Sequence, residues 1–314
     1  MIDINSLEIF KTNRYYPSDI GNISDNAYLS IVVTNNCQCN CSYCINSETD
    51  KSLNLPIDKA IINIKTLVSK YNIKEAILLG GEPLLHPQLF ELLKKLREES
   101  RLQFIRLTTN GIKLKNNPEF IKKLVDKDFG IQGINISFHN EDFLTWEEFK
   151  EVCSLIKKYN SDIKIRMNTN IWKNNLDNLY DLIDHIENAY FVDEIRISNL
   201  IFKDNFSVNS TNKESNNIIL TDSEYINIFN KLINDYKDIY TIINNNNTLG
   251  FVRYVLIPCK VPIIINWNIN STVSEQVCEN NYNERKINTF KCLVSGDISL
   301  SWNNNNIINL NVEN

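Results

Sequence analysis

Residues 28–44 have the sequence YLSIVVTNNCQCNCSYC, in which an apolar stretch leads into a polar turn and then into four cysteines. The apolar run 28–33 is typical of a buried strand, and the Thr-Asn-Asn that follows ends it. Three of the cysteines, Cys37, Cys41 and Cys44, have the spacing C-x3-C-x2-C. A loop with this spacing can fold back on itself and aim three thiolates at one point. The sequence therefore predicts a metal centre directly after the first strand.

Three sulfur ligands suit a metal centre that keeps one position open. Cysteine thiolates hold iron–sulfur clusters, and a four-iron cluster with three protein ligands leaves its fourth iron free to bind a small molecule. Structural zinc would need a fourth ligand, and the nearest histidine in the chain is His86. The spacing favours the cluster, with zinc or plain structural thiols as alternatives. Cys39 lies between two of the ligands, and we expect it to be a free thiol.

Three further polar motifs follow, each at the end of an apolar, strand-like stretch. They are Gly80-Gly81-Glu82-Pro83, Thr108-Thr109-Asn110-Gly111 and Asn135-Ile136-Ser137. Glycine lets the backbone approach a ligand closely, because no Cβ intervenes. In parallel α/β folds the chemistry lies at the carboxyl ends of the strands. The sequence therefore predicts that the three motifs and the cysteines share one site.

Together the four motifs resemble those of the radical S-adenosylmethionine (radical SAM) enzymes. Members of that family have C-x3-C-x-aromatic-C after the first strand, followed by GGEP, a third-strand TNG and a polar site on the fourth strand. Tyr43 fills the aromatic position. The resemblance covers residues 28–200. It implies a partial (β/α)6 TIM-like barrel, a [4Fe–4S] cluster on the three cysteines, and S-adenosylmethionine (SAM) as the second cofactor.

The resemblance also implies which residues contact SAM. The GGEP segment would hydrogen-bond the methionine amino group, with Glu82 as a charge partner. Four polar residues lie at family positions that contact the ribose or the carboxylate: Asn110, Ser137, Arg166 and Asn168. Ser137 and Asn168 are the preferred ribose contacts, and Arg166 would pair with the SAM carboxylate or with a neighbouring Glu. For each of the four, an ordinary hydrogen bond at a strand end is the alternative.

Strand-like and helix-like segments alternate from Tyr28 onward, which predicts an α/β fold of parallel strands joined by helices. After the first strand, we expect strands at 76–79, 104–109, 133–138, 163–169 and 194–198. We expect helices from about 56 and over 88–97, 118–126, 145–159 and 176–187. The predicted parts of the chain are an N-terminal arm (1–27), the partial barrel (28–200), a loop and helix (201–249) and a β-rich extension (250–314).

The last two parts have their own local signals. The polar segment 199–219 is a candidate lid, or else a solvated linker. Thr221 followed by Glu224 predicts the capped start of a helix over 221–236. Strand-like stretches follow at 250–257 and 261–267, and a hairpin over 287–302 would turn at Ser295-Gly296. The extension could cover substrate or hold an auxiliary cluster.

Three cysteines of the extension, Cys259, Cys278 and Cys292, could hold a second iron–sulfur cluster, as in several radical SAM subfamilies. The gap from Cys278 to Cys292 equals the one in the GTP-cyclising enzymes of molybdenum-cofactor synthesis, but Cys259 is far upstream of the position expected there. Alternatively Cys259, at a strand end, could donate a hydrogen atom to a substrate radical. Structural thiols are the third interpretation.

Composition limits the partners and the compartment. The chain has 314 residues, a formal net charge of −5 and interspersed charges, so there is no basic stripe for nucleic acid. Eight cysteines, three in a metal-type spacing, indicate a reducing compartment rather than a disulfide framework. No leader and no apolar run long enough to span a bilayer are evident. We expect a cytoplasmic protein with no membrane partner.

The resemblance implies a radical enzyme. Reductive cleavage of SAM at the cluster would give methionine and a 5′-deoxyadenosyl radical, which takes a hydrogen atom from the substrate. Flavodoxin or ferredoxin is the expected kind of electron donor. The acidic balance favours a small-molecule substrate, and a peptide, epimerised or cross-linked, is the alternative. A non-redox zinc-binding barrel and a cluster scaffold are alternatives from other classes.

Overall fold

A computed structural model shows the chain as two compact units. The cysteine-loop unit comprises Tyr16–Ser137, Phe143–Ile165 and Glu284–Asn314. The other unit comprises Met1–Tyr15, Phe138–Asp142 and Arg166–Asn283, and we call it the hairpin unit after its own antiparallel strands over 241–268, which are distinct from the hairpin predicted over 287–302. The residues that the structure describes are 23–41, 43–44, 46, 49–139, 143–176, 191–200, 241–244, 251–257, 263–268, 287–300 and 307–310, with single positions between 220 and 234. In this division residues 284–314 belong to the cysteine-loop unit and residues 166–200 to the hairpin unit, and the predicted parts of the chain stay a prediction.

The cysteine-loop unit is built on a sheet with the strand order β11-β10-β1-β2-β3-β4. The strands are β1 (Ile23–Thr34), β2 (Glu75–Gly80), β3 (Phe104–Thr109), β4 (Ile131–Ser137), β10 (Ile287–Cys292) and β11 (Ile298–Ser299). The pairs β1–β2, β2–β3 and β3–β4 are parallel, which confirms the predicted topology. Their carboxyl ends therefore lie at one edge of this sheet.

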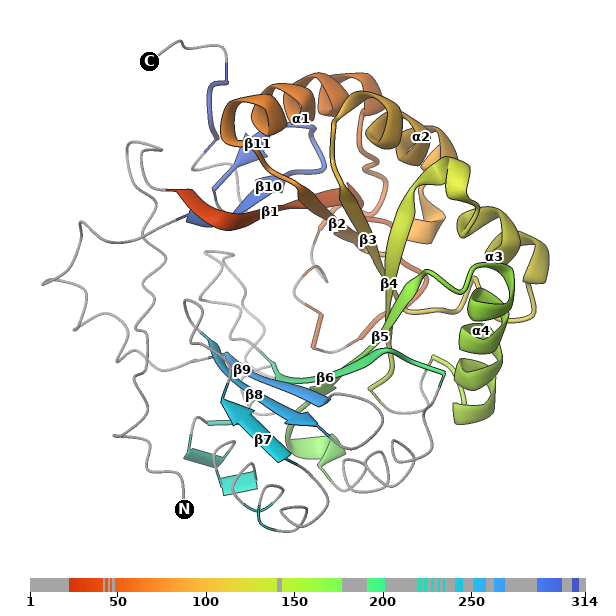
Figure 1. Ribbon diagram of the computed structural model, residues 1–314, viewed down its shortest axis with the longest axis vertical. Coiled ribbons are helices and arrows are strands. Elements are labelled where there is room, and N and C mark those ends of the chain that lie inside the picture. Colours follow the sequence, from red (N-terminus) through yellow and green to blue (C-terminus); the bar gives the residue numbers. More distant parts are fainter. Residues whose placement is uncertain are drawn as a thin grey trace, which may run out of the picture. The chain divides into compact units, whose positions relative to one another are not determined.

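Helices cover one face of this sheet (Figure 1). They are α1 (Ile57–Tyr71), α2 (Leu89–Glu99), α3 (Pro118–Leu124) and α4 (Trp146–Tyr159), with short 3-10 turns η1 (Pro83–Leu85) and η2 (Lys127–Phe129). In α1 the apolar residues Ile57, Ile61, Ile64 and Val68 recur at one-face spacing, and all four are buried. Thr145 and Glu148 form a capping box that fixes the start of α4.

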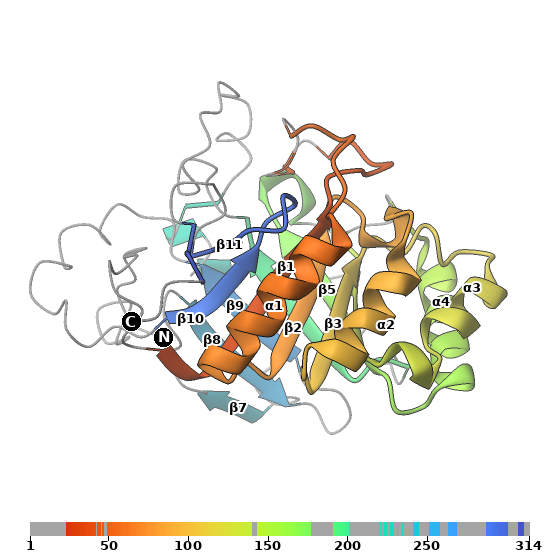
Figure 2. The same cartoon turned by 90° about the horizontal axis from the view of Figure 1, so that it is seen from above.

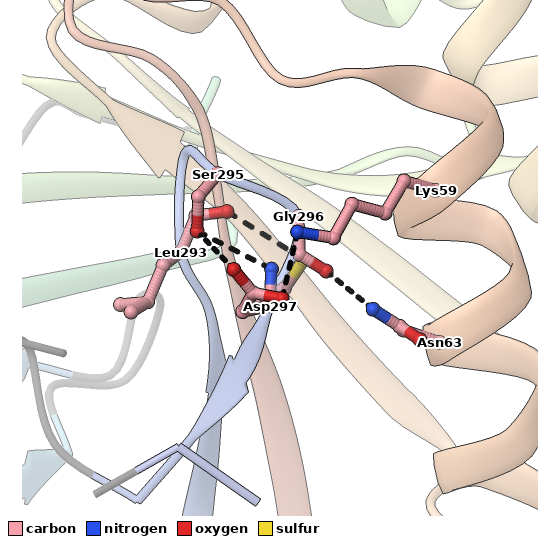
Figure 3. Close-up of polar contacts among 7 residues, drawn as sticks. Lys59, Asn63, Leu293, Ser295, Gly296 and Asp297 are labelled. Carbon is pink, nitrogen blue, oxygen red and sulfur yellow. Dashed lines mark hydrogen bonds and ion pairs between the residues drawn. The ribbon is translucent and has the colours of Figure 1, made fainter. Parts of the chain in front are cut away.

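The predicted hairpin over 287–302 forms from β10 and β11, and it belongs to the sheet of the cysteine-loop unit. β10 pairs in parallel with β1 on the side opposite β2, and both views show β10 and β1 side by side (Figures 1 and 2). The turn at Gly296 has a φ of 84°, which favours glycine. α1 holds the turn: Asn63 Nδ2 donates to Gly296 O at 2.9 Å, and Lys59 Nζ lies 2.7 Å from Asp297 Oδ1 (Figure 3).

The hairpin unit has the strand order β5-β6-β9-β8-β7. Its strands are β5 (Lys164–Ile171, of which Arg166 onward belong to this unit), β6 (Glu194–Asn199), β7 (Thr241–Asn244), β8 (Phe251–Ile257) and β9 (Ile263–Asn268), and the turn η3 (Lys173–Asn175) follows β5. β6 is parallel to both β5 and β9, whereas β7, β8 and β9 form an antiparallel meander. The predicted strands at 250–257 and 261–267 are thus confirmed.

The structure describes only some of the residues on which the other predictions for this unit rest. Thr221 and Glu224 form the predicted cap, with Glu224 N donating to Thr221 Oγ1 at 3.2 Å and Thr221 N donating to Glu224 Oε2 at 2.8 Å. The predicted helix over 176–187 lies almost wholly outside the described residues, as does the candidate lid over 199–219. Within the described part of the chain, no helix combines the length and apolarity needed to cross a membrane.

Candidate functional site

The loop that contains the four cysteines is closed at its base. Asn35 N donates to Leu53 O at 3.0 Å, and Leu55 N donates to Val33 O at 2.9 Å, so the segments before and after the loop lie side by side. Thr34 Oγ1 also lies 2.8 Å from Asn54 Oδ1. The cysteines therefore belong to a loop whose two ends are both fixed at the carboxyl end of β1.

The GGEP turn packs directly on the start of this loop. Gly81 N donates to Thr34 O at 2.7 Å, and Glu82 N donates to Asn36 O at 2.7 Å. A Cβ on Gly80 would lie 2.2 Å from Thr34 O, and one on Gly81 would lie 2.3 Å from Asn36 O. The structure thus gives these glycines a reason other than the expected approach of a ligand: they let the turn contact the backbone of the cysteine loop.

Glu82 connects the same turn to the end of β3. Its side chain is 1% exposed and accepts hydrogen bonds from Leu84 N at 3.0 Å, Thr109 Oγ1 at 2.7 Å and Asn110 N at 2.8 Å. Burial raises the pKa of the Glu82 carboxyl, although these hydrogen bonds act in the opposite direction. The expected charge partner of SAM is therefore already held by three donors of the protein.

Asn110 lies between the end of β3 and the cysteines. Its Nδ2 is 3.5 Å from Cys39 Sγ and 3.9 Å from Cys37 Sγ. Its Oδ1 accepts hydrogen bonds from Ile112 N at 3.0 Å and Gln38 Nε2 at 3.2 Å. The predicted SAM contact thus touches the cysteine loop itself, and the GGEP, TNG and cysteine motifs form one hydrogen-bonded assembly.

The cysteines have a donor set that fits an iron–sulfur cluster. Cys37, Cys41 and Cys44 are half-buried, and the backbone N–H of Cys39 points at Cys37 Sγ over 3.4 Å. In the described part of the chain, no three His, Cys, Asp or Glu side chains gather closely enough to hold a single metal ion. A four-iron cluster does not need that, because each cysteine binds a different iron. Thiolates with nearby N–H donors suit such a group.

Cys39 differs from its neighbours in its chemistry. Burial, and secondarily the neighbouring Cys37 and Cys41, raise the pKa of its thiol to about 12. A thiol with this pKa stays protonated at neutral pH, and a protonated thiol is a poor metal ligand. The expectation that Cys39 is a free thiol agrees with these surroundings and stays a prediction.

The remaining residues named by the resemblance belong to both units. Tyr43 is half-buried in the cysteine loop, and Ser137 is half-buried at the end of β4. In the hairpin unit, the guanidinium of Arg166 pairs with the carboxylate of Glu194, the alternative partner expected from the sequence. Asn168 Oδ1 is buried and has no hydrogen-bond partner in the described part of the chain. Since burying an unpaired amide oxygen costs free energy, Asn168 is the stronger candidate for a ligand contact.

Only one of the three tail cysteines lies in the described part of the chain. Cys292 is fully buried in β10, and burial raises the pKa of its thiol to about 12. This environment suits a structural thiol rather than a cluster ligand. Cys259 and Cys278 lie outside the described residues, so the auxiliary cluster and the hydrogen-donor role of Cys259 stay predictions.

The sequence alone assigned no role to two further buried polar residues, Thr109 and His139. Thr109 is 2% exposed, and its hydroxyl donates to Glu82 while accepting from Gly111 N at 3.0 Å. Its position next to Asn110 in the TTNG motif was the available signal. His139 is buried after β4, where Nδ1 accepts from Asn170 N at 2.9 Å. Burial lowers the pKa of His139 to about 4, so its imidazole is neutral at physiological pH.

Comparison with known proteins gives both a family and a fold. Residues 31–186 match the family model described as the Radical SAM superfamily. A GTP 3',8-cyclase of Clostridium perfringens (strain SM101 / Type A) is 30% identical over 172 residues, which are 50% of this chain and 50% of that protein. The chain thus corresponds to about half the length of this relative.

Two crystal structures of SuiB from Streptococcus suis resemble the chain over most of its length. The structure bound to S-adenosylmethionine has a TM-score of 0.59 at 14% identity and covers 90% of this chain and 63% of SuiB. The structure bound to the precursor peptide SuiA has a TM-score of 0.58 at 14% identity and covers 90% and 62%. At this identity the likeness concerns the fold alone, and it confirms the predicted α/β partial-barrel class. Through residues 31–186, the chain belongs to the radical SAM superfamily, whose enzymes use a [4Fe–4S] cluster and S-adenosylmethionine.

Proposed function

We propose that Cys37, Cys41 and Cys44 hold a [4Fe–4S] cluster and that the chain uses SAM to begin a radical reaction on a small-molecule substrate. When bound, the cluster and SAM supply reductive cleavage to methionine and a 5′-deoxyadenosyl radical, which takes a hydrogen atom from the substrate. The observation that most supports this proposal is the hydrogen-bonded assembly of the cysteine loop with the GGEP and TNG motifs.

The protein's own contribution is position and exclusion of water. A carbon radical reacts with almost any C–H bond, so the substrate must be held close and dry. In this proposal the GGEP backbone binds the SAM amino group, while Ser137 and Asn168 bind the ribose. The guanidinium of Arg166 already pairs with Glu194. To contact the SAM carboxylate as well, it would have to bind both carboxylates at once. Tyr43, at the aromatic position of the cysteine motif, is the remaining cofactor-binding candidate.

The substrate class is supported by the relatives and by charge. The similar proteins from Clostridium perfringens are GTP 3',8-cyclases, and the net charge of −5 does not indicate a polyanionic macromolecule as partner. A peptide substrate is the second candidate, because the fold resembles that of SuiB, which has been crystallised with its precursor peptide. A flavodoxin or ferredoxin as electron donor and a cytoplasmic location complete the proposal.

Anaerobic reconstitution tests the activity. The protein is incubated with iron and sulfide, freed of unbound metal, and given SAM with dithionite, and 5′-deoxyadenosine is quantified. We expect four irons per chain at the proposed site and 5′-deoxyadenosine that depends on both SAM and reductant. Zinc without iron would instead support the zinc-binding alternative, and a stable cluster that never cleaves SAM would support the scaffold alternative.

The substrate class needs a separate measurement. GTP deuterated on its ribose serves as the small-molecule probe, because the curated relatives are GTP cyclases. Transfer of deuterium into 5′-deoxyadenosine would support a nucleotide substrate. Absence of transfer from GTP, together with transfer from a deuterated peptide encoded beside this protein, would replace the small-molecule proposal with the peptide one.

A further inference from the structure

Asn110 was expected to contact SAM, yet its side chain is directed at the cysteine sulfurs. Nδ2 lies 3.9 Å from Cys37 Sγ and 3.5 Å from Cys39 Sγ, both within reach of an N–H···S hydrogen bond. An amide nitrogen has two hydrogens, so both contacts can exist together. Cys37 is one of the proposed cluster ligands, whereas Cys39 is not.

The orientation of the amide is fixed independently of the sulfurs. Ile112 N lies 3.0 Å from one terminal atom of the Asn110 side chain, and a backbone N–H can only donate. That terminal atom must therefore be the oxygen, and Gln38 Nε2 donates to the same oxygen at 3.2 Å. The other terminal atom, which faces Cys37 and Cys39, must then be the nitrogen.

The backbone of Asn110 is held in place as well. Its N–H donates to the buried carboxylate of Glu82 at 2.8 Å, and the residue is 8% exposed. A buried amide nitrogen without an acceptor would cost free energy, and the sulfurs are acceptors within its reach. Because the amide is already ordered, it can act on a bound cluster without first losing side-chain freedom.

We propose that Asn110 is a positioning residue for the cluster, whose amide donates an N–H···S hydrogen bond to Cys37 and raises the reduction potential of the cluster. This inference rests on the proposed cluster site. Each electron added to a cluster increases the negative charge on its sulfurs, so a donor to a ligating sulfur stabilises the reduced form more than the oxidised form. Loss of the donor should make the cluster harder to reduce.

Asn110→Ser is the test variant. The side chain of serine is shorter than that of asparagine, so its hydroxyl can still accept from Ile112 N but cannot reach the sulfurs. Asn117→Ser is the matched control: Asn117 Oδ1 accepts from Phe120 N at the start of α3, and serine is also a good N-cap. Both proteins are reconstituted anaerobically, their iron is counted, and the midpoint potential is measured by redox titration followed by electron paramagnetic resonance, without SAM.

We expect Asn110→Ser to retain iron and to shift the midpoint potential to a more negative value, while Asn117→Ser matches the parent protein. An unchanged potential in Asn110→Ser would overturn the inference. A change only in SAM affinity would also overturn it and would restore the SAM-contact role. A parent protein that binds no cluster would overturn the proposed function itself, which is a distinguishable outcome.

A second measurement covers the case in which Asn110→Ser fails to assemble a cluster. The parent protein is made with asparagine labelled with ¹⁵N at Nδ2, and the reduced cluster is examined by pulsed electron paramagnetic resonance. We expect a weak ¹⁵N coupling that persists in Asn117→Ser. If the parent shows no such coupling, the amide does not donate to a ligating sulfur and the inference is wrong.

Discussion

Single residues of the cysteine loop differ in what surrounds them. Cys37 receives a backbone N–H from Cys39 and lies next to the amide of Asn110. Cys39 is held protonated by burial and by its neighbouring thiols, which give it a pKa of about 12. The spacing of the cysteines led to the ligand prediction, but it could not show the contact with Asn110, because Asn110 follows β3 and lies 73 residues further along the chain than Cys37.

Replacement of single cysteines tests this assignment. We expect Cys37→Ala, Cys41→Ala and Cys44→Ala each to abolish formation of 5′-deoxyadenosine, because each removes one of three ligands. Cys39→Ala should retain the cluster and at least half of the parent's activity. Iron content and product formation are measured for all four. Loss of iron in Cys39→Ala together with retention in one of the others would show that the wrong three thiolates were chosen.

Among the predicted SAM contacts, residue type alone could not separate structural from ligand-facing groups. The sequence places Glu82, Asn110, Arg166 and Asn168 alike at strand ends. The structure shows that Glu82 and Arg166 have partners in the protein and that Asn168 Oδ1, within the described residues, has none. Which polar groups are already satisfied is a property of packing, and packing is not visible in a motif.

At the scale of elements, the GGEP turn and the start of the cysteine loop behave as one piece. Two backbone hydrogen bonds of 2.7 Å join them, and both glycines allow a contact that no other residue could make. The order of strands and helices followed from the alternation of apolar segments. The parallel pairing of β10 with β1 did not, because the tail is separated from β1 by most of the chain and local pattern does not choose a partner strand.

Gly81→Ala tests the contact between the turn and the loop. The new Cβ would lie 2.3 Å from Asn36 O and 2.6 Å from Asn35 O, so the backbone must move. We expect a loss of about 1–3 kcal/mol in the free energy of unfolding, typical of overpacking, and a several-fold loss of bound iron. Urea unfolding and iron analysis measure the two effects.

Gly133→Ala is the control for this prediction. Apart from its neighbours in the chain, the atom nearest to the new Cβ would be Arg106 Cγ at 3.2 Å, and this atom belongs to a flexible side chain that can move. We expect parent-like iron content in this variant. Equal iron loss in Gly81→Ala and Gly133→Ala would contradict a specific role for the contact between the turn and the loop.

The turn between β10 and β11 gives a pH prediction. Lys59, and secondarily Ser295, lower the pKa of Asp297 below its ordinary value of 3.8. A carboxyl whose folded pKa is lowered stabilises the folded state fully above its unfolded pKa, and this contribution is lost as pH falls through the lower folded value. We expect Asp297→Asn to destabilise the protein by up to about 1 kcal/mol at pH 7, since the pair is partly exposed.

Urea unfolding between pH 7 and pH 3 measures this effect, and the difference between Asp297→Asn and the parent should shrink toward the acidic end. Asp162→Asn is the control, because Asp162 pairs with Lys127 while both side chains are more than three-quarters exposed, at 77% and 79%. We expect a smaller effect there. A difference for Asp297→Asn that grows as pH falls would contradict the assignment.

For the whole molecule, the radical SAM region accounts for about half of the chain, and the expected SAM contacts belong to two units. The cysteines and the GGEP and TNG motifs lie in the cysteine-loop unit, whereas Arg166 and Asn168 lie in the hairpin unit. The motif order in the sequence was enough to predict the fold class and the family. The division into two units was not predicted, because pairings between distant segments, such as that of β10 with β1, are not visible in a local sequence pattern.

The central claim is that three cysteines leave one iron of the cluster open for SAM. Electron–nuclear double resonance of the reduced cluster, with SAM carrying ¹⁵N in its amino group, tests this most directly. We predict a ¹⁵N coupling strong enough for direct bonding to iron, which disappears when the label is diluted with unlabelled SAM. A cluster that forms with full iron content yet shows no ¹⁵N coupling would contradict the claim.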